Sequence, residues 1–194
     1  MPRYFTLSSF APSLIGSISA VAFRPKTFFE EMTSTESYRN SVIFLLLILM
    51  VPMLIDSYSI SEEKVASVFP AMEGFGLLLA WLWAGYIYWS IRLFTKYRLE
   101  HADAFQIAAY SYVPVLLDFS VLLIVPAFFW QLFITWRGMV HFVGISSKEA
   151  FWFMFIPVVL LLAGGLAFVM MAALSGIDFI SPLLYDDYVA KPHR

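Results

Sequence analysis

The run GFGLLLAWLWAGYIYWSI, residues 74–91, contains no charged side chain. A helix needs about 20 consecutive apolar residues to cross the hydrocarbon core of a bilayer. With its flanking residues included, we interpret 72–94 as one membrane span. Neighbouring stretches of the chain have the same character, and together they decide the fold class.

Two further stretches are long enough for one span each. Residues 40–61 carry a single charge, on Asp56, and residues 150–177 carry none. We therefore predict membrane spans at 40–60 and 150–174.

The apolar stretch in the middle of the chain is too long for one membrane helix. Only Asp118 is charged between residues 104 and 136. We expect a very short turn near Val125 and Pro126, because proline commonly ends a helix, although within a membrane it can also kink one. The stretch is therefore predicted to form two spans, 104–122 and 125–143, which brings the total to five.

The composition of the 194-residue chain agrees with a membrane location. Hydrophobic residues make up 61% and charged residues 13%, against about 45–50% and about 25% in soluble domains. A soluble fold has too few polar side chains here to cover its apolar surface. We therefore predict an all-α integral membrane bundle of five transmembrane helices. The absence of cysteine excludes disulfides and thiolate chemistry.

The basic residues predict the orientation, because cytoplasmic loops are enriched in lysine and arginine. With the N-terminus in the cytoplasm, three basic residues fall outside: Lys64, Lys191 and Arg194. The other nine fall inside: Arg3, Arg24, Lys26, Arg39, Arg92, Lys96, Arg98, Arg137 and Lys148. We therefore expect the N-terminus inside and the C-terminal tail, residues 176–194, outside.

Residues 1–39 form a separate N-terminal segment. Apolar residues at helical spacing define one face of a helix: Leu14, Ile15, Ile18, Val21 and Ala22. Serines lie opposite: Ser13, Ser17 and Ser19. This pattern is typical of an amphipathic helix in the membrane interface. The triplet Ala20-Val21-Ala22 also fits a signal-peptide cleavage site, which stays open as the alternative.

Several short motifs follow one another in a fixed order from about residue 18 to residue 175. A proline and an aromatic pair precede the first span, the third span opens with AAYSYVP at residues 108–114, and the fourth carries Trp136-Arg137-Gly138. In order and spacing these motifs resemble the Ypt-interacting-protein (YIP) family of small membrane proteins. The positions that carry the resemblance are Pro25, Phe28, Phe29, Tyr110, Pro114 and Gly138.

The resemblance implies five helices, a cytoplasmic N-terminus and a short outer C-terminus. Eukaryotic members of the family bind Rab-type GTPases, act in vesicle traffic and usually carry a long N-terminal region. Here only about 39 residues precede the first span. The chain therefore looks like a prokaryotic member, which places it in the cytoplasmic (inner) membrane.

Ionisable and polar residues within spans are costly and are therefore candidate sites. Counting back by fours from Asp118 gives one helical stripe: Gln106, Tyr110, Pro114 and Asp118. One interpretation is a hydrated or ligand-binding crevice inside the bundle. The other is a polar seam that holds helices together, with Asp118 near headgroup water.

Two charged groups near the membrane surfaces are further candidates. Arg137 and His141 are four residues apart and could bind an anion or a lipid headgroup at the cytoplasmic interface, or could simply lie in that interface. Four acids lie near the outer surface and could attract cations, or could form a solvated acidic face: Asp56, Glu62, Glu63 and Glu73.

The sequence contains no motif of a hydrolase, metalloprotease or nucleotide-binding site, and we predict neither a catalytic residue nor a metal or cofactor. We therefore expect a non-catalytic scaffold or a lipid-organising protein. The alternatives are an oligomeric transporter of ions or small solutes that uses the stripe around Asp118 and, with less support, an intramembrane enzyme that acts on lipid. Membrane lipids are the expected partners, with a protein partner or a second copy of the chain as alternatives. The net charge of −2 argues against nucleic acid.

Overall fold

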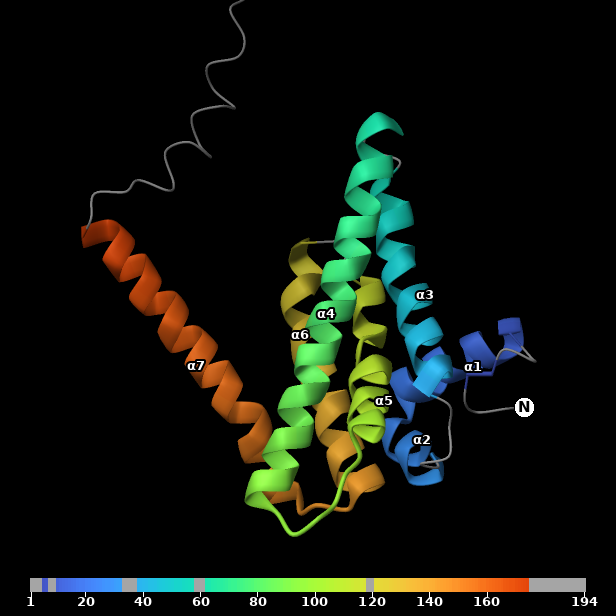
Figure 1. The fold of residues 1–194 in the computed structure, drawn as a ribbon, viewed down its shortest axis with the longest axis vertical. Helices are drawn as coiled ribbons and strands as arrows, with labels where there is room; N and C mark the ends of the chain where they lie inside the picture. Colours follow the sequence, from blue (N-terminus) through green and yellow to red (C-terminus); the bar gives the residue numbers. More distant parts are fainter. Residues whose placement is uncertain (1–4, 7–9, 33–37, 58–61, 118–120, 175–194) are drawn as a thin grey trace, which may run out of the picture. The chain divides into compact units, whose positions relative to one another are not determined.

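The computed structural model describes residues 5–6, 10–32, 38–57, 62–117 and 121–174 (Figure 1). The chain divides into two compact units, Met1–Phe153 and Met154–Arg194, which are treated separately below. In its described part the chain forms helices only: α1 (Phe10–Phe23), α2 (Pro25–Glu31), α3 (Tyr38–Ser57), α4 (Glu62–Phe94), α5 (His101–Ser111), η2 (Val113–Leu117), α6 (Val121–Gly138), η3 (Met139–Val143) and α7 (Ser147–Leu174). The predicted all-α class is confirmed.

Three helical segments of the described chain are long and apolar enough to cross a membrane: Gly74–Phe94, Leu122–Val143 and Ser147–Phe168. Two shorter apolar helical segments are Phe10–Phe23 and Tyr38–Pro52. The membrane character is therefore clear, while the count of five spans stays a prediction.

The third predicted span is interrupted. Helix α5 ends at Ser111, and after Tyr112 the chain continues as the 3₁₀ helix η2. Pro114 lacks a backbone N–H and disfavours helical geometry at the residue before it, so α5 ends just upstream. The described part of this predicted span is therefore not one continuous α-helix.

The break before the fourth predicted span lies earlier than we expected. Helix α6 begins at Val121, and Pro126 lies inside it. The turn predicted near Val125 and Pro126 is therefore wrongly placed, because α6 accommodates the proline within its own length. At its other end, α6 continues into the π-helix η3, which stops at Gly144, whose φ of 83° suits glycine.

In unit 1, helices α3, α4, α5 and α6 run side by side, and α1 and α2 lie against one side of them (Figure 1). Hydrogen bonds from described residues of α4 reach α6 and α7. The indole N–H of Trp83 donates to the hydroxyl of Thr135 on α6 at 3.4 Å, and the hydroxyl of Tyr86 donates to the carbonyl of Phe153 at 2.6 Å.

The described part of unit 2 is the remainder of α7, residues 154–174, which contains no charged residue. Most of its described large side chains are exposed, among them Leu160, Leu162 and Leu166. This exposure is what a lipid-facing helix requires, since lipid replaces water as its solvent.

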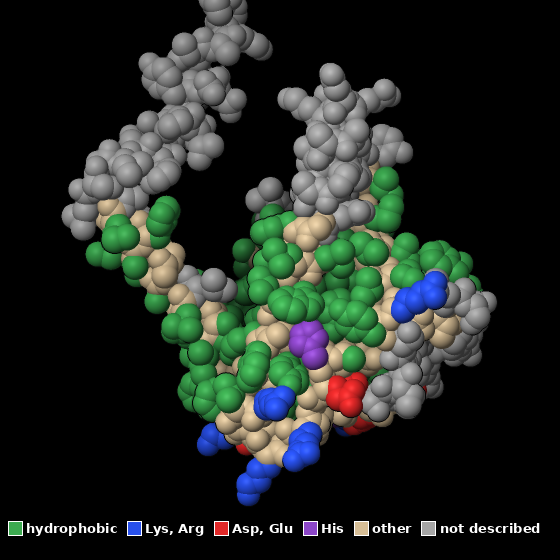
Figure 2. Space-filling model, viewed as in Figure 1, with side chains coloured by type: hydrophobic (Ala, Val, Ile, Leu, Met, Phe, Trp, Pro, Cys, Tyr) green, Lys and Arg blue, Asp and Glu red, His purple; other side chains and the backbone are tan. Residues whose placement is uncertain are grey.

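Figure 2 shows a broad hydrophobic surface on unit 1 and a group of basic side chains at the end where α4 leads into α5. Exposed basic residues of this end are Arg92, Lys96 and Arg98. An extensive exposed apolar surface of this kind is typical of a membrane-spanning bundle.

Helix α1 is oriented by its serines. Ser13 and Ser17 are fully buried, whereas Ile15 is 69% exposed and Phe23 is 77% exposed. The Ser13 hydroxyl donates to the carbonyl of Thr6 at 2.9 Å and accepts from the Thr6 backbone N–H at 3.1 Å. Ser13 and Ser17 therefore pack against the protein, whereas Ser19 is exposed and Ile15 and Phe23 point outward.

A helix forms where the amphipathic helix was expected, but its predicted apolar face is only partly the exposed face. Its place in the membrane interface stays a prediction. Val21 belongs to that face and is fully buried beside the serines. The division into faces differs because hydrogen bonds satisfy the serine hydroxyls inside the protein, so that burying them carries little cost.

Candidate functional site

The aromatic motif of the N-terminal segment, Phe28-Phe29, lies in the core. Phe28 and Phe29 on α2 are fully or almost fully buried. The ring of Phe28 lies 4.9 Å from the ring of Tyr110 on α5, and the ring of Phe44 on α3 lies 4.6 Å from Tyr110 on another side. Tyr110 therefore joins α2, α3 and α5 in one aromatic cluster.

Gly138 allows close contact between α6 and two other helices. A Cβ atom at this position would lie 2.7 Å from Cγ2 of Ile107 on α5 and 3.2 Å from the ring of Phe29 on α2. Both distances are shorter than ordinary van der Waals contact. The six motif positions, which are Pro25, Phe28, Phe29, Tyr110, Pro114 and Gly138, are all buried and lie on α2, α5, η2 and α6.

The predicted polar stripe lies within this packing as far as it is described. Gln106 is 1% exposed and Tyr110 is fully buried, and Pro114 is buried in η2. Asp118 lies outside the described residues. None of the three described members lines the cavities considered below.

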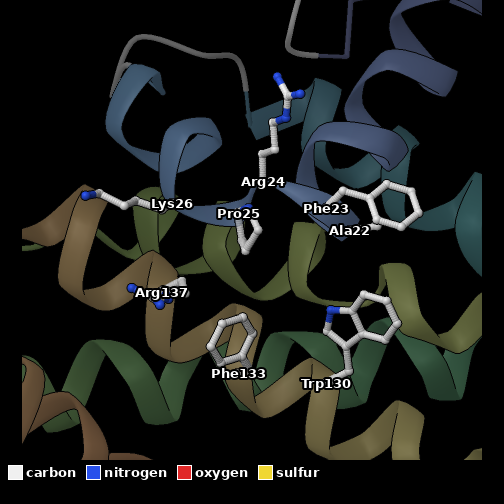
Figure 3. A pocket seen from close by; sticks show the side chains of 8 residues that line it. All are labelled: Ala22, Phe23, Arg24, Pro25, Lys26, Trp130, Phe133 and Arg137. Carbon is white, nitrogen blue, oxygen red and sulfur yellow. The ribbon is translucent and has the colours of Figure 1, made fainter.

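A proline creates the corner that positions the basic residues. Pro25 is the first residue of α2, and the preceding Arg24 has φ −138° and ψ 51°, outside the helical region. A residue before proline avoids helical geometry, so α1 and α2 meet at an angle here. This corner places Pro25 and Lys26 at a groove beside α6 and Arg24 at the edge of that groove (Figure 3).

A groove of about 520 Å³ lies between this corner and α6 (Figure 3). Its lining combines basic and apolar side chains: Ala22, Phe23, Arg24, Pro25, Lys26, Trp130, Phe133 and Arg137. In Figure 3, Pro25 points toward the rings of Trp130 and Phe133 on α6, Lys26 and Arg137 lie on one side, and Arg24 extends away from α6. We call this the basic groove.

The cations of the basic groove are held by aromatic and polar neighbours. The Arg137 guanidinium lies 5.1 Å from the centre of the Phe133 ring and 4.7 Å from that of Trp136, distances typical of cation–π contact. Its Nη1 lies 3.3 Å from Nε2 of His141. Arg137 is thereby held in place while remaining partly exposed at the groove.

One carboxylate balances this group of cations. Oε1 of Glu30 lies 3.8 Å from Nζ of Lys26, one helical turn away on α2, and 3.2 Å from Nδ1 of His141. Glu30 and Lys26 are 46% and 60% exposed at their side chains, so their attraction is weak and easily exchanged for another partner.

The structure therefore brings together the predicted pair Arg137 and His141 with residues that sequence reasoning missed. Lys26 and Glu30 are more than 100 positions away in the chain, and only the contact between α2 and α6 brings them close. The basic residues on each side of Pro25 were the signal available in the sequence. The role of Arg137 and His141 in anion binding stays a prediction.

Another cavity, of about 300 Å³ and with a polar lining, includes His141 in its wall. It is lined by Phe29, Glu30, Met32, Arg98, Leu99, Asp103, His141, Phe142 and Val143. Burial raises the pKa of Asp103, and the charge of Glu100 adds to this, against a backbone hydrogen bond from Glu100 that lowers it. Among the described residues, no group of three or more acids or histidines could hold a metal ion.

The predicted outer acidic group cannot be placed. Asp56 lies on α3, and Glu62, Glu63 and Glu73 lie on α4, but their side chains lie outside the described residues. Their interpretation as a cation-attracting face stays a prediction.

Comparison with known proteins identifies the family. The family model for the Yip1 domain matches residues 18–169, which include the groove, the aromatic cluster and all six motif positions. Neither a curated protein nor a solved structure matches the chain. Because the match covers most of the sequence, the chain belongs to the Yip1-domain family of membrane proteins.

Proposed function

We propose that this protein is a non-catalytic, lipid-organising membrane protein that binds the phosphate of an anionic phospholipid in the basic groove. The observation that carries the proposal is the convergence of Lys26 and Arg137, from two different helices, on one groove with an aromatic wall. Arginine and lysine are the side chains that bind phosphate oxygens most strongly. Arg24, at the edge of the groove, adds positive charge to its approach.

The position of the basic groove favours a lipid over a soluble anion. Arg137 lies near one end of the candidate span Leu122–Val143, where phospholipid phosphates lie. Phe133 and Trp130 lie about one and two turns from Arg137 on the same helix and supply an apolar wall for the glycerol and the first acyl carbons. A ligand with a phosphate and an apolar tail matches both parts.

Helix α1 supports the same conclusion. It has 14 residues, or about 21 Å at about 1.5 Å per residue, which is too short to span about 30 Å of hydrocarbon. It contains no charged residue, and Phe10, Ile15 and Phe23 are exposed on it. These features suit a helix that lies in one leaflet, beside the headgroups that the basic groove would bind.

We further propose that this leaflet is the cytoplasmic one, in a five-span arrangement within a prokaryotic inner membrane. The exposed basic residues Arg92, Lys96, Arg98 and Lys148 support it, because positive charge is retained on the cytoplasmic side. No observation favours transport or lipid chemistry over this account. The transport alternative needs a hydrated path along the stripe, and the described stripe residues Gln106 and Tyr110 are buried in packed surroundings.

The test is a binding titration on the full-length protein in neutral detergent with short-chain phosphatidylglycerol. The double variant Lys26→Gln, Arg137→Gln is expected to bind at least about tenfold more weakly, since two charge-assisted contacts are lost. Glycerol 3-phosphate serves as the soluble probe and should bind far more weakly than the lipid, because it lacks the apolar tail.

Arg92→Gln is the matched control. Arg92 also lies over aromatic rings, those of Tyr88 and Trp89, but on α4 and outside the basic groove. Its loss should leave affinity within about twofold of the wild type. Equal affinity of the double variant and the wild type would refute the proposed function, and equal affinity for lipid and glycerol 3-phosphate would identify a site for soluble phosphate instead.

A further inference from the structure

The two ring nitrogens of His141 contact groups with opposite hydrogen-bonding roles. Nη1 of Arg137 can only donate a hydrogen bond, so Nε2 of His141, 3.3 Å away, must accept it with a lone pair. The carboxylate of Glu30 can only accept, so Nδ1 of His141, 3.2 Å away, must carry the proton. A neutral imidazole with its hydrogen on Nδ1 satisfies both contacts.

The same carboxylate oxygen also contacts Lys26, a lining residue of the basic groove. Oε1 of Glu30 lies 3.8 Å from the ammonium of Lys26 and 3.2 Å from His141. His141 in turn contacts Arg137, so the two proposed phosphate ligands, Lys26 and Arg137, are joined through Glu30 and His141. A change of charge on His141 must affect both ligands.

We propose that His141, through Glu30, makes anion binding in the basic groove dependent on pH, with tighter binding in acid. This inference rests on the proposed function and names the regulation of that same site. Histidine is suited to the role because imidazole changes its charge between about pH 5 and 8.

Protonation of His141 acts on both cations in the same direction. A proton on Nε2 removes the lone pair that Arg137 uses and places two positive charges next to each other, so Arg137 is driven from His141 toward the groove. The imidazolium also attracts Glu30 more strongly, which weakens the hold of Glu30 on Lys26. Both ligands thereby become available to a phosphate.

The other charged groups around His141 do not reverse this direction. Lys26 and Glu30 face it from α2, and Arg137 lies on its own helix. Arg98 and Asp103 line the polar cavity together with His141. Their charges are opposite when both are ionised, so their effects on His141 oppose each other. A bound phosphate would itself favour the imidazolium, since the coupling between two binding events is reciprocal.

The experiment measures the dissociation constant of short-chain phosphatidylglycerol for the full-length protein from about pH 8 to about pH 5. The phosphodiester of this lipid stays anionic over the whole range, so any change reports the protein. The wild type is expected to bind about threefold to tenfold more tightly at the acidic end.

Two variants isolate the coupling. His141→Phe keeps a ring without a titratable nitrogen, and its affinity should be independent of pH; His141→Gln tests the same point if the phenylalanine variant does not fold. Glu30→Gln removes the competing carboxylate, so its affinity at pH 8 should already be near the acidic value of the wild type. His101→Asn is the control, since His101 lies against Trp81 and Tyr88 away from the basic groove and should keep the wild-type pH profile.

The outcomes separate the two proposals. A flat pH profile in the wild type, or an unchanged profile in a folded His141 variant, would overturn the coupling while leaving the proposed function intact. Wild-type affinity in the Lys26→Gln, Arg137→Gln variant would refute lipid binding in the basic groove itself.

Discussion

At the scale of single residues, Gly138 shows how packing and site are connected. Its missing side chain lets α6 approach Ile107 on α5 and Phe29 on α2, and the neighbouring Arg137 depends on that approach for its place beside α2. The glycine could be identified in the sequence as a motif position, but its reason could not, because the atoms it would meet come from distant segments. The same holds for Lys26 and Glu30, whose partners on α6 become apparent only once the helices are assembled.

We predict that Gly138→Ala destabilises the protein by about 1–3 kcal/mol, because the new methyl group would overlap Ile107 and the helices must move apart. Gly85→Ala on α4 is the control, since nothing lies within 4 Å of a Cβ built there, and alanine is the better helix former. Thermal unfolding in detergent should give a lower midpoint for the first variant and an equal or higher midpoint for the second. Equal midpoints for Gly138→Ala and the wild type would contradict the close contact.

At the scale of elements, hydrophobic patterning predicts the helices well and their ends poorly. The charge-free runs correctly indicate α4, α6 and α7, because a membrane helix needs a long apolar stretch. The start of α6 could not be predicted, since Pro126 is compatible with both a break and a helix interior. The hydrophobic pattern also could not predict which face of α1 is buried. The Ser13 hydroxyl forms hydrogen bonds with the backbone of Thr6, and this serine can therefore be buried.

The outward face of α1 can be tested with spin labels, since the chain has no native cysteine. Single variants Ile15→Cys and Phe23→Cys, labelled in liposomes, are expected to be more accessible to oxygen than to a water-soluble nickel complex, because their side chains point into lipid. Lys96→Cys, exposed and outside the basic groove, is the matched control in water and should show the reverse. Greater nickel access at Ile15 and Phe23 would place α1 outside the membrane.

At the scale of the whole molecule, family and membrane character were available from the sequence, whereas the basic groove was not. The motifs distributed between about residue 18 and residue 175 indicated the family that the match to residues 18–169 establishes. The basic groove requires the corner at Pro25 to meet α6, a meeting that no local pattern encodes. The membrane orientation, which was inferred from the distribution of basic residues along the sequence, stays a prediction.

We predict that cysteines introduced at Lys96 and Ser146, in the two segments that follow α4 and η3, react with a membrane-impermeant thiol reagent only when the cytoplasmic side is accessible. Both segments lie near exposed basic residues, which are retained in the cytoplasm. Glu63→Cys, assigned to the outer side by the span count, is the opposite control. Labelling of the Lys96 variant from outside intact cells would reverse the topology.

The most direct test of the central claim is an experimental structure of the full-length protein in nanodiscs that contain phosphatidylglycerol. The account predicts a lipid in the basic groove, with phosphate oxygens within about 3 Å of the Lys26 ammonium and the Arg137 guanidinium and an acyl chain along Trp130 and Phe133. A lipid phosphate bound elsewhere, with the groove holding only acyl chain or closed by the protein's own side chains, would contradict it.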